Sequence, residues 1–441
     1  WYLRAGIQAR ARGAISEARR LLERSLELTP AEAKERRWQV ALEHNTILYP
    51  LGEPEKLRAS TNDLLVLGKE LGDTFLAEAY FRQVLSFYTT GDYRQAQQMY
   101  PIARLAAQRV HNLNIEIRLL GMMVFILNRV GDRTEVEKVV QELRARMHDV
   151  DEEALAKPLN NLAIYYVESG DMAQAAELHS QVADILHRLG DRIGEANSYD
   201  NIGYDYICLG LYDEGQTATQ KALEIHNAIG ARREALYARL NLGLALMRKG
   251  NLKEAGRLFE GAQQESVRIG DEFARAACHS YLALSLEQSH ETRRAFENFT
   301  RAAELYESVG AQGYAADARA GLARIALAQG DLTSAREHIH SVWDRLHLHG
   351  ATGMEFPILG YLTCAEIYQA LGETGISRQA IEEGYHELTR RADRLSNSLW
   401  RTSYLENVPE HGALAAKWKA LAHDSGLIDQ KEIQNGSPGS P

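Results

Sequence analysis

Apolar side chains recur along most of the chain at intervals of three and four residues. One stretch shows this spacing at Ala175, Leu178, Val182, Ile185, Leu186 and Leu189. Such intervals place the apolar residues on one face of an α-helix, whereas a half-buried strand would alternate apolar and polar residues. Because we find no segment with strand-like alternation, the pattern predicts an all-α protein.

Glycines divide these helical segments at a constant period. Four turns lie 40 residues apart, at Leu189-Gly190, Ile229-Gly230, Ile269-Gly270 and Val309-Gly310. His349-Gly350 is expected to continue this series. A second series has the same period but is offset by half: Gly91, Gly131, Gly170, Gly210, Gly250 and Gly330. Two turns in each period predict two helices per repeat, and a repeat of this length is typical of a solenoid.

The second series has its own motif, Gly-Asp/Asn-x-x-x-Ala. It begins at Gly91, Gly170, Gly250 and Gly330. Glycine can adopt the left-handed conformation that ends a helix, and the next Asp or Asn can accept backbone N–H groups and cap the following helix. The small residue then allows the two helices to pack closely. In one repeat His290 replaces the glycine, and we favour harmless drift of one turn over a kink.

The first helix of each repeat has a recurring phrase in which an apolar residue precedes Ala or Gly. Its copies are Asn161-Leu162-Ala163, Asn201-Ile202-Gly203, Asn241-Leu242-Gly243, Tyr281-Leu282-Ala283 and Gly321-Leu322-Ala323. Together with the turn motif, these phrases resemble the tetratricopeptide repeat. A period of 40 residues would also fit HEAT or armadillo repeats, but the Gly-Asp-x-x-x-Ala turn favours the tetratricopeptide repeat. The resemblance implies a right-handed superhelical solenoid of roughly ten antiparallel helix hairpins.

The domain organisation follows from where the repeats are clear. We expect the solenoid over residues 1–395, with weak repeats in 1–70 and clear repeats in 71–390, then capping helices over 396–424 and a flexible, Gly- and Pro-rich tail over 425–441. Residues 398–411 are similar to the closing segment of repeat arms in bacterial signal-transduction ATPase regulators such as the maltose regulator. This likeness implies an ATPase module before the repeats in a larger parent protein; a trimmed stand-alone protein is the alternative.

Composition narrows the range of partners and the cellular compartment. The chain has 50 Lys and Arg against 60 Asp and Glu, a net charge of -10, which disfavours nucleic acid and anionic lipid. No run approaches the ~18–20 apolar residues of a membrane span. Cys208, Cys278 and Cys364 are widely separated and form no metal or redox motif. We therefore expect a cytoplasmic protein with reduced cysteines.

Motifs for chemistry are absent from the sequence. There is no Walker-type phosphate loop, no Rossmann fingerprint and no HExxH. His338, His340, His347 and His349 are close in sequence, but i and i+2 positions of a helix point to different sides. We expect no catalytic residues, no cofactor and no metal ion.

A partner is expected on the concave face, which the first helices line in tetratricopeptide solenoids. The 40-residue period aligns Asn161, Asn201, Asn241, Tyr281 and Gly321 in one column, and Lys157, Asn197, Tyr237, Ala277 and Asp317 in the column one helical turn earlier. The candidate site is composed of Lys157, Asn161, Tyr165, Asn197, Asn201, Tyr204, Asp205, Tyr237, Asn241 and Tyr281. Asparagine amides can donate to and accept from the backbone of an extended peptide. The alternative is that each Asn bonds a neighbouring helix.

These features predict a scaffold that binds a protein or peptide in its groove, as the interaction arm of a larger bacterial regulator. A different class of function, a sensor for a sugar or metabolite, would require a closed pocket in place of an open groove. A purely structural spacer is the third alternative.

Overall fold

Helices form almost all of the described part of the protein. The computed structural model describes residues 1–424, apart from the side chains of Arg133, Asp149, Ala173, Ala176 and Asp424. The predicted tail, 425–441, lies outside the described residues. Within residues 1–424 no strand occurs, which confirms the all-α prediction.

The helices follow one another with short connections. They are α1 (Tyr2–Ala11), α2 (Ile15–Leu28), α3 (Lys34–Leu51), α4 (Pro54–Leu71), α5 (Asp73–Thr89), α6 (Tyr93–Arg109), α7 (Leu113–Val130), α8 (Arg133–Arg146), the short 3-10 helix η1 (Met147–Asp149), α9 (Glu152–Ser169), α10 (Met172–Leu189), α11 (Arg192–Cys208), α12 (Tyr212–Ile229), α13 (Arg232–Arg248), α14 (Leu252–Ile269), α15 (Glu272–Gln288), α16 (Thr292–Ser308), α17 (Gln312–Ala328), α18 (Leu332–His349), α19 (Pro357–Ala370), α20 (Thr374–Ala392), α21 (Ser398–Glu406) and α22 (Pro409–Asp424). Each odd-numbered helix from α1 to α19 packs on the even-numbered helix that follows it. This gives ten hairpins.

The turn motif works as its residue types predict. Gly91, Gly170, Gly250 and Gly330 have φ between 74° and 81°, and the following Asp side chains accept N–H groups at the starts of α6, α10 and α18. Asn251 differs, because its side chain makes no cap bond. His290 takes the place of glycine with φ 61°, so the drifted turn keeps its shape.

The small residues mark the helix crossings. The alanine of each turn motif is fully buried, as at Ala96, Ala175, Ala255 and Ala335. In the first helices a Cβ at Gly243 would overlap the ring of Phe259, and a Cβ at Gly321 the ring of Phe299. The phrase that resembles the tetratricopeptide repeat therefore encodes close packing of a first helix on the second helix of its own hairpin, as at Gly243, or of the preceding hairpin, as at Gly321.

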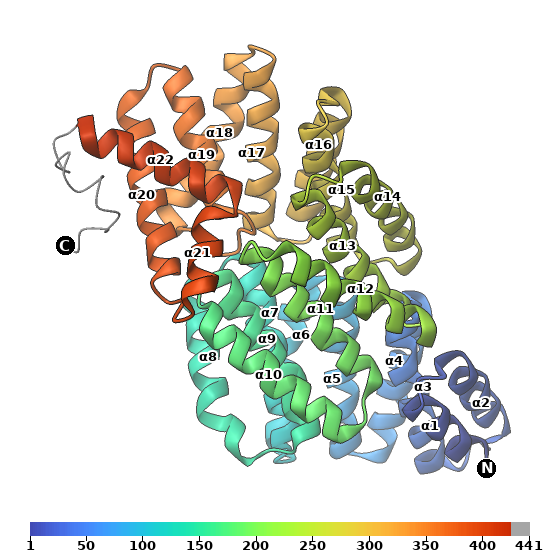
Figure 1. Cartoon of the computed structure of the whole chain (residues 1–441). Helices are drawn as coiled ribbons and strands as arrows, with labels where there is room; N and C mark the ends of the chain where they lie inside the picture. The colour runs from blue at the N-terminus through green and yellow to red at the C-terminus, as the bar shows by residue number, and fades with distance from the viewer. Residues whose placement is uncertain (425–441) are drawn as a thin grey trace.

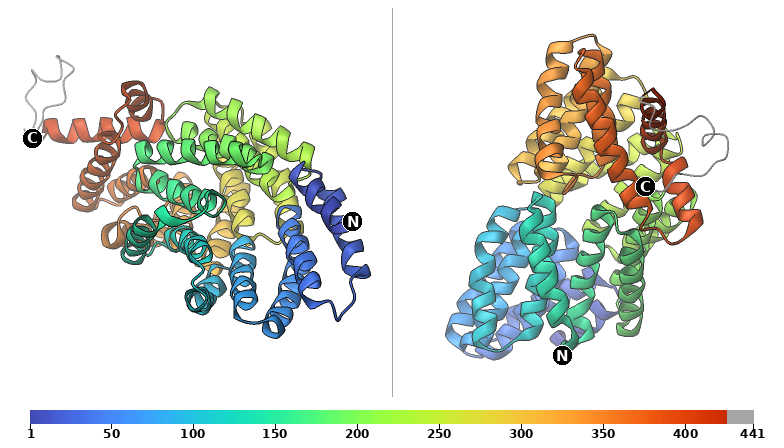
Figure 2. Two further views of the ribbon diagram at one scale, coloured as in Figure 1. Left: turned by 90° about the horizontal axis from the view of Figure 1, so that it is seen from below. Right: turned by 90° about the vertical axis from the view of Figure 1, so that its left-hand side faces the viewer.

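The hairpins wind into two stacked superhelical turns. Figure 1 shows α1–α12 below and α13–α22 above, and the right-hand view of Figure 2 shows the same two tiers from the side. Where the tiers meet, Gly52 of the second hairpin faces Ile269 of the seventh, and Gly91 of the third faces Phe273 of the eighth. Gly170 of the fifth hairpin faces Arg391 of the tenth. Each contact joins a hairpin to the fifth one after it, and we call this line of contacts the seam.

Two largely buried arginines stabilise the seam through hydrogen bonds and ion pairs. Arg233 at the start of α13 donates to the backbone oxygen of Thr89 at 3.1 Å, to the Tyr49 hydroxyl at 3.2 Å and to Asp271 at 2.9 Å. Arg248 donates twice to Glu410, at 2.7 and 2.8 Å. Glu410 belongs to α22, which packs on α19 and α20, and Gly210 of the sixth hairpin faces Asn407 between α21 and α22. The α21–α22 pair therefore occupies the place of an eleventh hairpin at the seam.

Two sequence observations have a direct structural counterpart. None of the three cysteines forms a disulfide. Among residues 1–424, no helix combines the length and apolar character that crossing a membrane requires.

A pair of glycine substitutions tests the packing argument. Gly243→Ala should destabilise the fold by about 1–3 kcal/mol, because the added methyl group overlaps Phe259 in a filled core. Gly256→Ala in α14 meets no atom within 4 Å and should stabilise the fold by about 0.5–1 kcal/mol through helix propensity. Urea unfolding of both variants provides the measurement, and equal shifts in the same direction would contradict the crossing geometry.

The Arg248–Glu410 pair tests the seam. Glu410→Gln should lower the free energy of unfolding by roughly 3 kcal/mol, since it leaves the Arg248 charge buried without its counter-charge. The matched control is Glu304→Gln, which breaks an exposed i,i+3 pair with Arg301 and should cost about 0–1 kcal/mol. A Glu410→Gln variant as stable as this control would show that the pair does not hold the seam.

Candidate functional site

The odd-numbered helices enclose the interior of the superhelix. Across the seam α3 contacts α13, and α7 contacts α17. All ten predicted site residues lie on α9, α11, α13 and α15, which are first helices of their hairpins.

The asparagine row lies between neighbouring first helices. Asn161 is only 2% exposed; its amide donates to the backbone oxygen of Gly121 on α7 at 3.0 Å and accepts from Tyr88 at 3.4 Å. Asn201 donates to Asn160, and Asn241 is hydrogen-bonded to Asp200. Each amide thus reaches back to the preceding repeat, as in the structural alternative that the sequence left open.

Asp200 is an unusual member of this row. It is 7% exposed, and its Oδ1 has no hydrogen-bond partner among the described residues. Burial raises the pKa of Asp200 to about 7, against the smaller opposing effect of Asn241. Buried carboxyl groups without a cation favour their neutral form.

Lys157 is the exposed member of a group of otherwise half-buried or buried side chains. Its side chain is exposed, its Nζ lies 5.6 Å from the centroid of the Tyr49 ring, and none of the described carboxylates lies within ion-pair distance. The Tyr49 phenol raises the pKa of Lys157, so this side chain is a cation at neutral pH. Tyr237 donates to Asp271 at 3.0 Å and joins the group through Arg233.

A second group surrounds a residue that the sequence analysis missed. Glu355 accepts from the Tyr204 hydroxyl at 3.0 Å and from the Tyr281 hydroxyl, and its backbone N–H donates to Asp317 at 2.7 Å. Burial raises the pKa of Glu355 and that of Asp317, the latter to about 8.

The expected turn at His349-Gly350 is present, because α18 ends at His349 and Gly350 has φ 64°, but the connection that follows is longer than in the other repeats. The structure has a linker over residues 350–356, and α19 begins at Pro357. The proline could have given this boundary, because proline is favoured at the first position of a helix.

The remaining predicted residues are dispersed. Asp205 is buried and pairs with His179 of α10 at 2.6 Å, so it faces a second helix of the preceding hairpin. Tyr165 packs edge-on against Tyr166 with ring centroids 5.3 Å apart. Asn197 is half-buried on α11. The structure thus brings together Lys157, Asn161 and Tyr237 around Tyr49 and Arg233, and separately Tyr204 and Tyr281.

The sequence analysis also missed Arg129, whose guanidinium contacts aromatic rings and a carboxylate from several hairpins. Its guanidinium lies 4.6–4.7 Å from the ring centroids of Phe125, Phe273 and Tyr314 and 3.2 Å from Glu168. The sequence shows that Arg129 lies near the end of α7, two residues before the turn glycine Gly131. The repeat period gives this position but does not indicate which side chains from other hairpins contact it.

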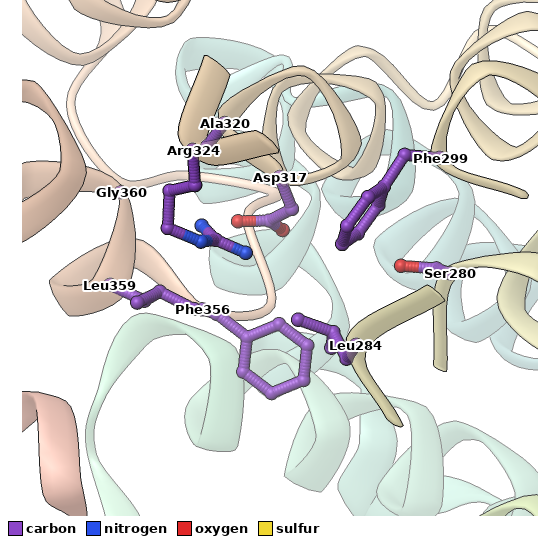
Figure 3. Close-up of a pocket in the computed structure, with 9 residues that line it drawn as sticks. All are labelled: Ser280, Leu284, Phe299, Asp317, Ala320, Arg324, Phe356, Leu359 and Gly360. Carbon is purple, nitrogen blue, oxygen red and sulfur yellow. The ribbon is translucent and has the colours of Figure 1, made fainter. Parts of the chain in front are cut away.

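Two cavities lie beside Glu355, and both are small. Figure 3 shows the first, which Asp317, Arg324 and Phe356 line and which has about 10 Å³ of room, enough for one water molecule. The second has about 70 Å³ and lies between Tyr204, Arg248 and the α21–α22 pair. Small-molecule sites usually have ~300–1000 Å³, so neither cavity offers room for a sugar. No cluster of metal-ligating side chains occurs within residues 1–424.

Comparison with known proteins identifies the repeat. Sequence models of the tetratricopeptide repeat match residues 154–228, and residues 202–266 and 291–339. Residues 154–266 and 291–339 therefore match tetratricopeptide repeats. No curated protein matches it in sequence.

Solved structures resemble this chain at low sequence identity. A Rap protein complexed with competence and sporulation factor is 13% identical with a TM-score of 0.55, covering 77% of this chain and 98% of that one. NprR in complex with its cognate peptide NprX is 14% identical with a TM-score of 0.52, covering 78% and 98%. A signal transduction ATPase with a tetratricopeptide repeat sensor from Pyrococcus horikoshii is 18% identical with a TM-score of 0.46, covering 85% of this chain and 56% of that one. These likenesses concern the fold alone.

Asp200 makes the stability of the asparagine row depend on pH. The pKa of Asp200 is about 7 in the folded chain against 3.8 when unperturbed. The stability that the neutral carboxyl group contributes to the folded state is therefore complete below about pH 4 and is lost as the pH rises to about 7. Wild type should therefore lose stability between about pH 6 and pH 8. In Asp200→Asn this loss should be smaller by about 1 kcal/mol.

Urea unfolding at both pH values measures this difference. Asp63→Asn, at an exposed position of α4, is the control and should keep the wild-type pH dependence. An unchanged pH dependence in Asp200→Asn would mean that Asp200 ionises freely.

Proposed function

We propose that the protein is a scaffold that binds an acidic peptide or an acidic segment of a protein on its concave face around Lys157. The observation that carries this proposal is the Lys157 ammonium, which is exposed in the interior and lies beside the Tyr49 ring. It has no carboxylate partner among the described residues. A cation without a counter-charge is ready to pair with an incoming anion.

A second cation lies on α7, the first helix that packs on α9. The net charge is -10, yet Arg118 on α7 also forms no ion pair within residues 1–424, and its guanidinium lies 4.0 Å from the centroid of the Phe81 ring. Lys157 and Arg118 are both on first helices. An acidic segment would gain attraction here and meet repulsion over much of the remaining surface, which favours this one binding place.

The shape of the interior favours an extended ligand. The second cavity is too small for a metabolite, at about 70 Å³, whereas the first helices present side chains at regular intervals along the concave face. The solved NprR structure contains the cognate peptide NprX, so this fold is compatible with peptide binding. Tyrosines such as Tyr49 and Tyr88 provide the large contact area that binding sites prefer.

In the cell we propose that the chain acts in the cytoplasm as the interaction arm of a larger signalling or transcriptional regulator with an ATPase module before the repeats. The support is the likeness of residues 398–411 to the closing segments of such arms. The scaffold would report the presence of its partner and would not catalyse a reaction.

Substitution of Lys157 tests the site. Peptides selected from a random display library on the wild-type chain should be enriched in Asp and Glu. Lys157→Glu should weaken their binding by about tenfold or more, or 1.4 kcal/mol, because it replaces attraction with repulsion. Fluorescence anisotropy measures the affinity.

Lys138→Glu is the matched control. It makes the same charge change on α8, a second helix, at a side chain that is 65% exposed. This variant should bind the selected peptides like wild type, and circular dichroism should show both variants folded. Selected peptides without acidic residues, or equal binding to Lys157→Glu, would refute the proposal.

A further inference from the structure

The connection between α18 and α19 departs from the repeat. The three turns at 190–191, 230–231 and 270–271 each have two residues between helices, but this one extends over 350–356. The additional residues do not form an outward loop. They enter the interior of the superhelix, where Met354 is 1% exposed.

The linker is held by the positions that were predicted to hold a partner. Tyr281 and Asp317 belong to the two columns of the concave face, and Tyr204 is a predicted site residue. The two hydroxyls bind the Glu355 carboxylate, and Asp317 accepts the Glu355 N–H. Side chains from α11, α15 and α17 therefore form one seat for a single residue of an extended segment.

The next residue is recognised by its ring. The Phe356 centroid lies 6.4 Å from that of Tyr281 in an edge-on arrangement, and the Arg248 guanidinium lies 5.5 Å from it. Figure 3 shows the ring beside Leu284, at the cavity that Asp317 also lines. Two tyrosine hydroxyls and the Asp317 carboxylate thus bind the acidic residue of this segment. The Arg248 guanidinium and the Tyr281 ring contact the aromatic residue that follows it.

The linker also contacts both superhelical turns. Gly353 has φ 74° and lies against the backbone of Asn128 and Gly131 in the lower turn, while Gly313 of the upper turn has no room for a Cβ beside it. Arg345 donates to the Thr352 oxygen at 2.7 Å. Whatever occupies this seat therefore lies at the seam.

We propose that residues 351–356 are an intramolecular ligand of the concave face, and that a partner peptide with an acidic residue followed by an aromatic residue competes with them for the Tyr204–Tyr281–Asp317 seat. This inference rests on the proposed peptide-binding function and specifies a second subsite and its ligand. Glu355 forms no ion pair among the described residues, so its carboxylate is held by neutral donors. An equivalent carboxylate from a partner can take the same bonds without leaving a buried cation unpaired.

The linker itself supplies the probe. A labelled synthetic peptide with the sequence of residues 350–358, Gly-Ala-Thr-Gly-Met-Glu-Phe-Pro-Ile, is added to the full chain and followed by fluorescence anisotropy. Wild type should bind it weakly, because the tethered linker competes at a millimolar effective concentration. Glu355→Gln with Phe356→Ala should vacate the seat and bind the probe about tenfold more tightly or better.

Controls separate the seat from other sites. A probe with Gln in place of its Glu should lose this gain, and so should addition of Tyr204→Phe with Tyr281→Phe to the vacated chain. The inference is overturned when a vacated chain that circular dichroism shows to be folded binds the probe no better than wild type, or binds the Gln probe equally well.

Hydrogen exchange covers the case of a vacated chain that fails to fold. Excess probe on wild type should speed the exchange of amides in 351–356, and unchanged exchange there would overturn the inference. Probe binding at the vacated seat tests this inference, whereas the peptides selected on the wild-type chain and the Lys157→Glu variant test the proposed function. The Lys157 proposal and the seat can therefore fail independently.

Discussion

Contacts between a hairpin and the fifth hairpin after it determine the form of this molecule. The turn glycines Gly52, Gly91 and Gly170 of the lower tier face the upper tier, and at Gly170 the backbone lies directly against the Arg391 side chain. A side chain at these positions would separate the tiers as well as strain a left-handed turn. In most solenoids a repeat contacts only its neighbours, but here the seam adds long-range contacts. It converts a linear stack into a closed body in which Arg233 and Arg248 are buried.

Closure explains why polar side chains of the concave face have two different roles. Where adjacent first helices meet, the amides of Asn161, Asn201 and Asn241 bind the preceding repeat, because a buried amide must find a partner. Where the interior stays wide enough for water, Lys157 remains exposed and unpaired. The same column of the repeat therefore contributes to the scaffold in one part and to the candidate site in another.

The linker combines both roles. It is packed as tightly as a core element at Gly353, yet Glu355 and Phe356 are bound through side-chain contacts of the kind that recognise peptides. Because the seat includes residues from α11, α15 and α17, its occupancy bears on the relation between the tiers. Binding on this face and the integrity of the seam are thus physically linked.

Local sequence determined the helices, the turns, the hairpins and the close crossings. Periodicity, glycine with φ near 75°, aspartate caps and buried alanines act within a few residues, so they can be read without knowledge of the rest of the chain. Even the exception at His290 preserves the local geometry. For the same reason the period placed the candidate residues on first helices of the hairpins.

Tertiary structure alone decided which hairpins meet and which side chains pair. Small rotations at every repeat add up over five hairpins, and the seam contacts that result carry no sequence periodicity of their own. The sequence therefore could not predict the contacts of Arg129. Nor could it predict that Tyr204 and Tyr281 both donate to Glu355. The sequence could place an asparagine on the concave face, but the distance to the next helix determined whether its amide was already bound.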